Sequence, residues 1–263
     1  MRFDAYPSWF IVLFAALTGA IVGSFLNVCI LRWGAEPKQS VVRPPSRCPR
    51  CGMGLAWYDN VPVLSWLILR ARCRGCGEPI SIQYPLVELA TAAIWAYMAW
   101  RHGPTLEALR GAVFGTILLG ITMTDAREYI IPDEFTWGGL VVGLLFSLAA
   151  GLSGLGMAAL GAVTGFAVLY LVGRAGTWIF KEEAMGGGDI KMMAMVGAFV
   201  GWQGVLLTIF IGAFIGSLIF LPLLMTGHKK LVPFGIFLSI GAATAYLIGP
   251  RLVVWYGNFI MGA

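Results

Sequence analysis

The sequence predicts an all-α membrane protein that crosses the bilayer many times and carries one small domain outside it. Of its 263 residues, 59% are hydrophobic and only 12% are charged, whereas soluble globular domains have about 25% charged residues. Four long stretches contain no charged residue: 5–31, 135–173, 192–228 and 231–250. A helix of about 20 apolar residues crosses the hydrocarbon core, so the shorter stretches fit one span and the longer ones two. This composition excludes an ordinary cytosolic enzyme.

About eight transmembrane helices follow from these stretches and from the apolar runs between them. We expect them at 9–31, 85–100, 106–124, 136–152, 157–178, 190–201, 203–225 and 232–250. The first is longer than the roughly 7–15 apolar residues of a signal peptide, so we expect it to be retained. The chain then divides into a first transmembrane helix (1–31), an extramembrane segment (32–84) and a transmembrane domain (85–263).

The basic residues orient the chain in the membrane. Segment 32–84 contains eight Lys and Arg residues and three acidic residues, which accounts for the whole net charge of +5. Short basic loops stay in the cytoplasm, so we expect this segment on the cytoplasmic side, with the loops near 125–135, 174–191 and 226–231. Membrane topology explains the basic segment better than nucleic-acid binding does. We therefore expect a lipid bilayer and no nucleic acid as partner.

Four cysteines in segment 32–84 form two C-x-x-C pairs, which are Cys48 with Cys51 and Cys73 with Cys76. Their spacing is close to that of a four-thiolate zinc ribbon. A domain of this size has too small a hydrophobic core to be stable by itself, so a bound metal or a cross-link is expected. Two disulfides or a redox pair are the alternatives, but a cytoplasmic location disfavours disulfides and no βαβ pattern surrounds either pair. We expect a structural Zn²⁺, since four thiolates leave no open position for catalysis.

Two aspartates lie at the ends of predicted spans. Asp125 ends the third span, and Asp189 begins the sixth, directly after Gly186-Gly187-Gly188. Carboxylates at such margins are candidate functional groups; the alternative is a solvated helix end or, for Asp189, a helix cap. The glycines favour function, because they cost chain entropy, give no packing and let a substrate strand approach closely. Two carboxylates that share a proton suit amide hydrolysis, with one as base and the other as acid.

At this point the chain resembles the type IV prepilin peptidases, membrane aspartic proteases of the G-x-G-D group. The motifs that carry the resemblance occur in the family's order along most of the chain. They are Gly23-Ser24-Phe25-Leu26-Asn27-Val28, Asp59-Asn60-Val61-Pro62-Val63-Leu64-Ser65-Trp66, Tyr84-Pro85-Leu86-Val87-Glu88-Leu89, Asp125 with Ile131-Pro132-Asp133, Glu183-Ala184-Met185-Gly186-Gly187-Gly188-Asp189-Ile190-Lys191, and Pro233-Phe234-Gly235.

The resemblance implies that Asp125 and Asp189 are the catalytic pair. It implies cleavage of the basic leader of prepilins, or of type II secretion pseudopilins, after a glycine at the cytoplasmic face of the bacterial inner membrane. Family members with the cysteine domain also methylate the new N-terminal amine, using S-adenosylmethionine. Two departures lie in the region linked to methyl transfer: Ala71 replaces a glycine, and Arg32-Trp33-Gly34 replaces arginine, an apolar residue and proline. Alanine strains the turn at residue 71 only if φ is positive there.

Several alternatives stay open. No Rossmann fingerprint locates a methyl-donor site; Glu88 either contributes to one or is an interfacial glutamate paired with an arginine, and Asn27 either has a role or makes only an inter-helix hydrogen bond. The acidic residues of the inner face either receive the basic leader or form a solvated surface; they are Glu128, Asp133, Glu134, Glu182 and Glu183. A transporter with a zinc module and a non-catalytic secretion-assembly factor are the competing functions.

Overall fold

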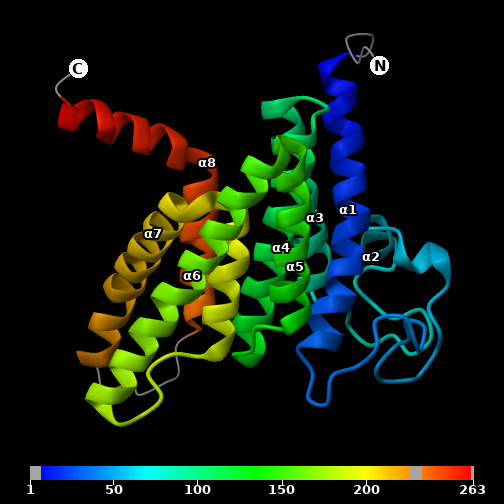
Figure 1. Cartoon of the computed structure of the whole chain (residues 1–263). Coiled ribbons are helices and arrows are strands. Elements are labelled where there is room, and N and C mark those ends of the chain that lie inside the picture. Colours follow the sequence, from blue (N-terminus) through cyan, green and yellow to red (C-terminus); the bar gives the residue numbers. More distant parts are fainter. Residues whose placement is uncertain (1–6, 226–232, 262–263) are drawn as a thin grey trace. The chain divides into compact units, whose positions relative to one another are not determined.

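The computed structural model of the chain describes residues 7–225 and 233–261, and within these it is helical, with two isolated bridges and no β-strand (Figure 1). The predicted loop 226–231 lies outside the described residues. The chain forms two compact units, Met1–Gly120 and Ile121–Ala263. Helix α4 (Leu106–Glu128) runs from the first unit into the second.

The first unit contains two long helices, α1 (Ser8–Trp33) and α3 (Gln83–His102), and the segment between them, with the 3-10 helix η2 (Trp57–Asn60) and helix α2 (Leu64–Ile68). Glycines let α1 and α3 pack closely. A Cβ at Gly19 would lie 2.8 Å from Cβ of Trp95, and one at Gly23 would lie 2.8 Å from Cα of Glu88. Small residues allow this kind of backbone approach between membrane helices.

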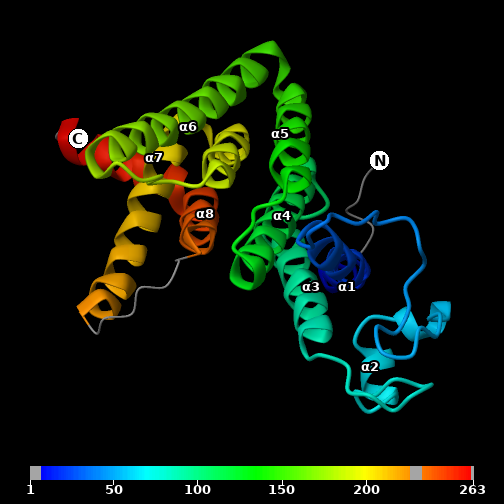
Figure 2. The same cartoon turned by 90° about the horizontal axis from the view of Figure 1, so that it is seen from below.

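The second unit is organised around α7 (Gly187–Met225), which packs against α5 (Asp133–Ser147), α6 (Gly151–Phe180) and α8 (Phe234–Met261) (Figures 1 and 2). A short 3-10 helix, η3 (Leu148–Ala150), joins α5 to α6. Helix α7 is interrupted at Gly201, where φ is 69° and ψ is 176°. This is the break that the sequence predicts between spans 190–201 and 203–225.

Glycines also bring α6 and α7 into backbone contact. A Cβ at Gly161 would overlap the carbonyl oxygen of Gly197, and a Cβ at Gly165 would overlap that of Met193. Each helix carries two glycines four residues apart at this crossing, as close membrane-helix pairs do. They are Gly161 and Gly165 in α6 and Gly197 and Gly201 in α7. Because α7 begins near Asp189, this crossing helps to set the position of that carboxylate.

Five stretches of the described helices are long and apolar enough to cross a membrane: Ser8–Trp33, Leu106–Glu128, Asp133–Phe180, Gly187–Phe220 and Phe234–Leu252. Two of them have 48 and 34 residues, more than the roughly 20 that one crossing needs, as expected of paired spans. Helix α3, the predicted second span, is not among them. It carries Glu88, Arg101 and His102, which lower its hydropathy. These helices support an integral membrane protein, and the count of eight stays a prediction.

Candidate active site and metal centre

Asp125 lies near the end of α4 with 5% of its surface exposed. The backbone N–H groups of Ile236 and Gly235, in the first turn of α8, donate hydrogen bonds to its carboxylate. Its Oδ2 atom is buried and has no hydrogen-bond partner among the residues that the structure describes. A Cβ at Gly235 would lie only 2.8 Å from this oxygen. Glycine is therefore required here for the start of α8 to reach the carboxylate.

Asp189 lies in the first turn of α7, where its backbone N–H donates to the carbonyl oxygen of Gly186 at 3.2 Å. Its Oδ1 atom is buried and has no hydrogen-bond partner in the described part of the chain. The carboxylate is close enough to Asp125 for the charge on that residue to act on it. The structure thus brings together, within one compact unit, the two aspartates that the sequence singled out.

The three glycines before Asp189 do not form one extended loop. Gly187 and Gly188 belong to the first turn of α7, and Gly186 precedes it. A Cβ at Gly188 would lie 2.9 Å from Cβ of Ile131, whereas the space around Gly187 is open within 4 Å. Gly188 differs from the expectation that these glycines give no packing, because its lack of a side chain admits Ile131.

Ile131 is the residue of this site whose role the sequence did not indicate. It lies in the loop between α4 and α5, and it contacts the starts of both α7 and α8. Its Cβ faces Gly188, and its Cδ1 would lie 2.9 Å from a Cβ at Gly235. The motifs Ile131-Pro132-Asp133 and Pro233-Phe234-Gly235 were noted in the sequence without a spatial relation between them. They meet at Gly235, which lies beside both Ile131 Cδ1 and Asp125 Oδ2.

An ion pair joins the starts of α5 and α7, close to the two aspartates in the sequence. Lys191 Nζ lies 2.7 Å from Asp133 Oδ1 and links α7 to α5. Glu128 forms an exposed pair with Arg127 at 3.7 Å. Glu182 and Glu183 are exposed. All five acidic residues that the sequence assigned to the inner face are exposed, Glu134 included, and Glu128 and Asp133 already pair with a basic residue.

The four cysteines converge in the first unit. Their Sγ atoms all lie within 4.8 Å of one another, with Cys48 and Cys76 at 3.9 Å and Cys51 and Cys73 at 4.0 Å. Tetrahedral zinc with Zn–S bonds of about 2.3 Å places its sulfurs about 3.8 Å apart. A disulfide needs about 2.05 Å. The donor set therefore fits a four-thiolate metal ion, and the cysteines are not disulfide-bonded.

The two cysteine pairs sit in turns of the same construction. In each, the first cysteine donates its N–H to the carbonyl five residues later, at 2.9 Å for Cys48 and 2.8 Å for Cys73. The residue after the second cysteine donates back to the first, at 2.9 Å in both turns. That residue, Gly52 or Gly77, has a φ of 73° or 71°, which glycine adopts without strain. Each turn therefore points two sulfurs toward the same centre.

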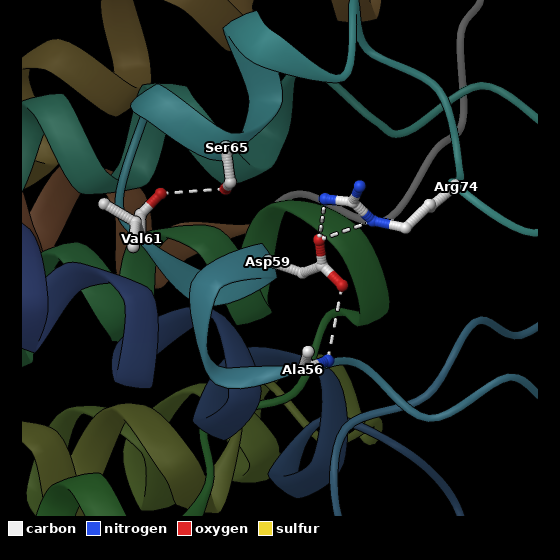
Figure 3. A network of polar contacts seen from close by, with 5 residues as sticks. All are labelled: Ala56, Asp59, Val61, Ser65 and Arg74. Carbon is white, nitrogen blue, oxygen red and sulfur yellow. Dashed lines mark hydrogen bonds and ion pairs between the residues drawn. The ribbon is translucent and has the colours of Figure 1, made fainter.

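Backbone amides favour the thiolate form of Cys48, whereas desolvation and hydrogen bonds with the other three cysteines raise the pKa of the Cys76 thiol from 9.0 to about 11. Backbone N–H groups of Cys51 and Arg50 lower the pKa of the Cys48 thiol from 9.0 to about 6. Arg74, between the third and fourth cysteines, lies 2.7 Å from Asp59, which also accepts the N–H of Ala56 (Figure 3). These contacts tie the second cysteine turn to η2.

The turn before the third cysteine contains two residues with positive φ, Arg70 at 50° and Ala71 at 58°. Ala71 is thus in the left-handed region, the case in which its replacement of glycine strains the turn. The sequence could identify this substitution but not the backbone angle on which its effect depends.

Glu88 and Asn27 have partners within the first unit. Glu88 is 6% exposed and accepts hydrogen bonds from the N–H of Val63, at 2.7 Å, and from Ser24. Within the described residues Glu88 thus pairs with Val63 and Ser24, and not with the arginine that one of the two alternatives required. Asn27 donates to the carbonyl oxygen of Tyr84 at 3.1 Å, which confirms the inter-helix hydrogen bond between α1 and α3.

Comparison with known proteins matches two family models in succession. The bacterial peptidase A24 N-terminal domain matches residues 17–102, and the type IV leader peptidase family matches residues 112–221. The first covers the four cysteines, and the second covers both aspartates. No solved structure matches the chain.

Curated relatives match along most of the chain. A prepilin leader peptidase/N-methyltransferase of Myxococcus xanthus is 41% identical over 87% of this chain and 69% of its own length. Proteins with the same name from Aeromonas hydrophila and Pseudomonas aeruginosa are 37% and 35% identical, over 96% and 94% of this chain and of their own lengths.

Proposed function

Because the chain belongs to the type IV leader peptidase family, we propose that it removes the basic leader of prepilins or pseudopilins by hydrolysis between Asp125 and Asp189. Cleavage follows a glycine at the cytoplasmic face of the bacterial inner membrane. The observation that carries this proposal is the pair of neighbouring carboxylates, each with a buried oxygen that lacks a partner in the described chain. Such oxygens are available to a water molecule and to a substrate carbonyl.

The surroundings of the two carboxylates suggest their roles. Asp125 accepts two backbone N–H groups, and hydrogen bonds of this kind favour the ionised form. Asp189 is buried beside the Asp125 charge, and both conditions disfavour its ionised form, so we assign the shared proton of the pair to Asp189. Asp125 then takes a proton from water as the oxygen attacks the peptide carbonyl, and Asp189 protonates the carbonyl oxygen. Asp125 then gives its proton to the leaving nitrogen while Asp189 takes a proton back from a hydroxyl of the tetrahedral intermediate, so the C–N bond breaks and both carboxyl groups return to their starting states.

The three glycines and the exposed acidic residues are the proposed substrate contacts. The junction of leader and apolar helix unwinds beside Gly186, Gly187 and Gly188, since a peptide bond inside a helix is not open to attack. The basic leader lies near Glu182 and Glu183. Charge reversal at both residues should raise the substrate KM, and an unchanged KM would remove this part of the proposal.

We also propose that Cys48, Cys51, Cys73 and Cys76 hold one structural Zn²⁺. With four thiolate ligands the ion has no position for substrate or water, so it orders the cysteine segment and takes no part in hydrolysis. The proposed arrangement is a first transmembrane helix (1–31), a cytoplasmic zinc-ribbon-like domain (32–84) and a transmembrane peptidase domain (85–263), with eight crossings in all. Reporter fusions after residues 42, 103 and 151 would test the orientation.

The names of the relatives support a second activity, N-methylation of the new N-terminal residue. The donor we propose is S-adenosylmethionine, and the strained backbone at Ala71 makes this the activity that most needs measurement.

One experiment tests both activities. The purified protein is incubated in detergent with a prepilin and S-adenosylmethionine, and the product is read by intact-mass spectrometry. Leader loss should vanish in Asp125→Asn and Asp189→Asn and persist in Glu107→Gln, a control at the other end of α4. Cleavage that survives both aspartate substitutions would refute the proposed site, and a transporter or an assembly factor would show no cleavage at all.

A further inference from the structure

Helix α2 is a short helix with apolar side chains directed outward. Leu64, Leu67 and Ile68 are 57%, 56% and 76% exposed. The two remaining residues of the helix are partly buried and hydrogen-bonded: Ser65 donates to the carbonyl oxygen of Val61, and Trp66 donates to that of Ile80. Every exposed side chain of α2 is thus apolar, which in water would be unfavourable.

The depth of α2 relative to α1 follows from hydrogen bonds within the first unit. Val63, the residue before α2, donates its N–H to Glu88, which also accepts from Ser24 of α1. Ser24 lies eight residues before Arg32, or about 12 Å along the helix at 1.5 Å per residue. Figure 1 shows α2 level with the lower half of α1 and not beyond its end.

Because Arg32 is the first charged residue after the apolar stretch of α1, it marks the membrane boundary on the side of the cysteine segment. A point about 12 Å from Arg32 toward the N-terminus of α1 lies inside the apolar part of that leaflet. Interfacial helices bury their apolar faces about 5–10 Å into the boundary between headgroups and acyl chains. The depth of α2, about 12 Å from Arg32 along α1, is slightly beyond the deep end of this range, so its apolar side chains are at the level of the acyl chains.

The residues next to α2 suit a lipid interface. On one side, η2 contributes Trp57, which is 81% exposed, and Trp and Tyr are enriched at membrane interfaces. On the other side, Arg70 and Arg72 are exposed and can reach anionic phosphates, as basic side chains near membranes do. The whole segment 32–84 carries the net charge of +5.

We propose that α2 inserts into the membrane leaflet on the side of the cysteine segment, with Leu64, Leu67 and Ile68 among the acyl chains. Lipid, and not a protein partner, covers this apolar surface. The consequence is a second attachment of the cysteine segment to the membrane, in addition to its covalent links to α1 and α3. This attachment limits how far the segment can move from the bilayer surface.

A matched pair of residues allows a direct test. Ile68 and Val42 are both apolar and 76% and 77% exposed. Val42, however, lies between Ser40 and Pro44, whose carbonyl oxygens accept the guanidinium of Arg32 at 2.6 and 2.7 Å. It is therefore held at the level of the membrane boundary, outside the acyl layer.

The photoreactive residue p-benzoylphenylalanine is placed at position 68, at position 42, or at position 14 of α1, where Phe14 is 66% exposed. Each protein is irradiated in nanodiscs of phosphatidylethanolamine and phosphatidylglycerol, with and without a prepilin, and adducts are identified by mass spectrometry. Phospholipid adducts are expected at positions 68 and 14, and none is expected at position 42. The proposal would be overturned if position 68 formed adducts with prepilin or with a second copy of the chain and none with lipid. It would also be overturned if lipid labelled position 42 as strongly as position 68.

Hydroxyl-radical footprinting of the unsubstituted protein in the same nanodiscs avoids any effect of the label on folding. Oxidation is expected at Val42 and protection at Leu67 and Ile68. Oxidation of all three to a similar extent would show that α2 faces water.

Discussion

Replacement of Gly235 by alanine tests whether the start of α8 positions the proposed catalytic carboxylate of Asp125. The added Cβ would lie 2.8 Å from Asp125 Oδ2 and 2.9 Å from Ile131 Cδ1. Atoms in contact are normally about 3.5 Å apart, so each of these two neighbours must move by roughly 0.6–0.7 Å. Asp125 and Gly235 are buried, and the main structural cost of such overpacking is about 1–3 kcal/mol.

The expected loss of activity is larger than the loss of folded protein caused by this destabilisation would produce. A misplacement of about 1 Å at a catalytic group costs about 100-fold in rate, so a shift of about two thirds of that size should lower kcat by about 10-fold or more. The substrate KM should change little, because the methyl group acts on Asp125 and not on the substrate.

The assay is the rate of leader removal from a purified prepilin, measured beside the thermal unfolding midpoint of each variant. Gly249→Ala is the matched control, since its Cβ would meet its nearest neighbours at 3.6 and 4.0 Å in the same helix. It should keep the wild-type kcat. A Gly235→Ala protein that folds and cleaves at the wild-type rate would refute the positioning role.

A double variant separates the two clashes. Ile131→Val removes the Cδ1 atom that the new methyl group would meet, and leaves the clash with Asp125. If the loss of activity arises at Asp125, the double variant should regain stability but not kcat. Recovery of kcat would instead assign the effect to the packing of Ile131.

The remaining predictions concern the cysteine segment and the helix contacts. Ala71→Gly should raise stability by up to about 1 kcal/mol, because relief of the left-handed alanine exceeds the added chain entropy; a lower unfolding midpoint would contradict the strain. Cys76→Ser should lower bound zinc from about one ion per chain, measured by mass spectrometry, and cleavage that persists would separate the metal from hydrolysis. Gly161→Leu should destabilise the protein by about 3 kcal/mol, since its side chain meets the α7 backbone, and normal thermal unfolding would refute that contact. Glu88→Ala should cost about 1–3 kcal/mol by leaving the Val63 N–H unpaired, whereas Glu88→Gln keeps an acceptor and should cost less; equal losses would contradict the hydrogen-bond explanation.

Some features of this protein follow from residues that are close together in the sequence. Charge-free stretches predict the apolar helices because the length of an apolar run decides whether it can cross the bilayer. The break at Gly201 lies at the boundary that the sequence predicts between spans 190–201 and 203–225, and the cysteine spacing predicts the cluster of four sulfurs. Asp125 and Asp189 stood out because carboxylates are rare beside apolar helices. Each of these inferences needs only local sequence and the physics of a membrane.

Other features depend on contacts between distant segments, and only the tertiary structure decided them. The start of α8 reaches Asp125 across more than 100 residues of chain, and Ile131 fills the space that Gly188 and Gly235 leave open. Glu88 finds the backbone of Val63 and not an arginine, and a positive φ makes Ala71 a strained substitution. Composition and spacing determine which helices and ligands form. The close approach of backbones at glycines determines which carboxylates, amides and side chains meet, because such contacts depend on the three-dimensional packing of whole helices.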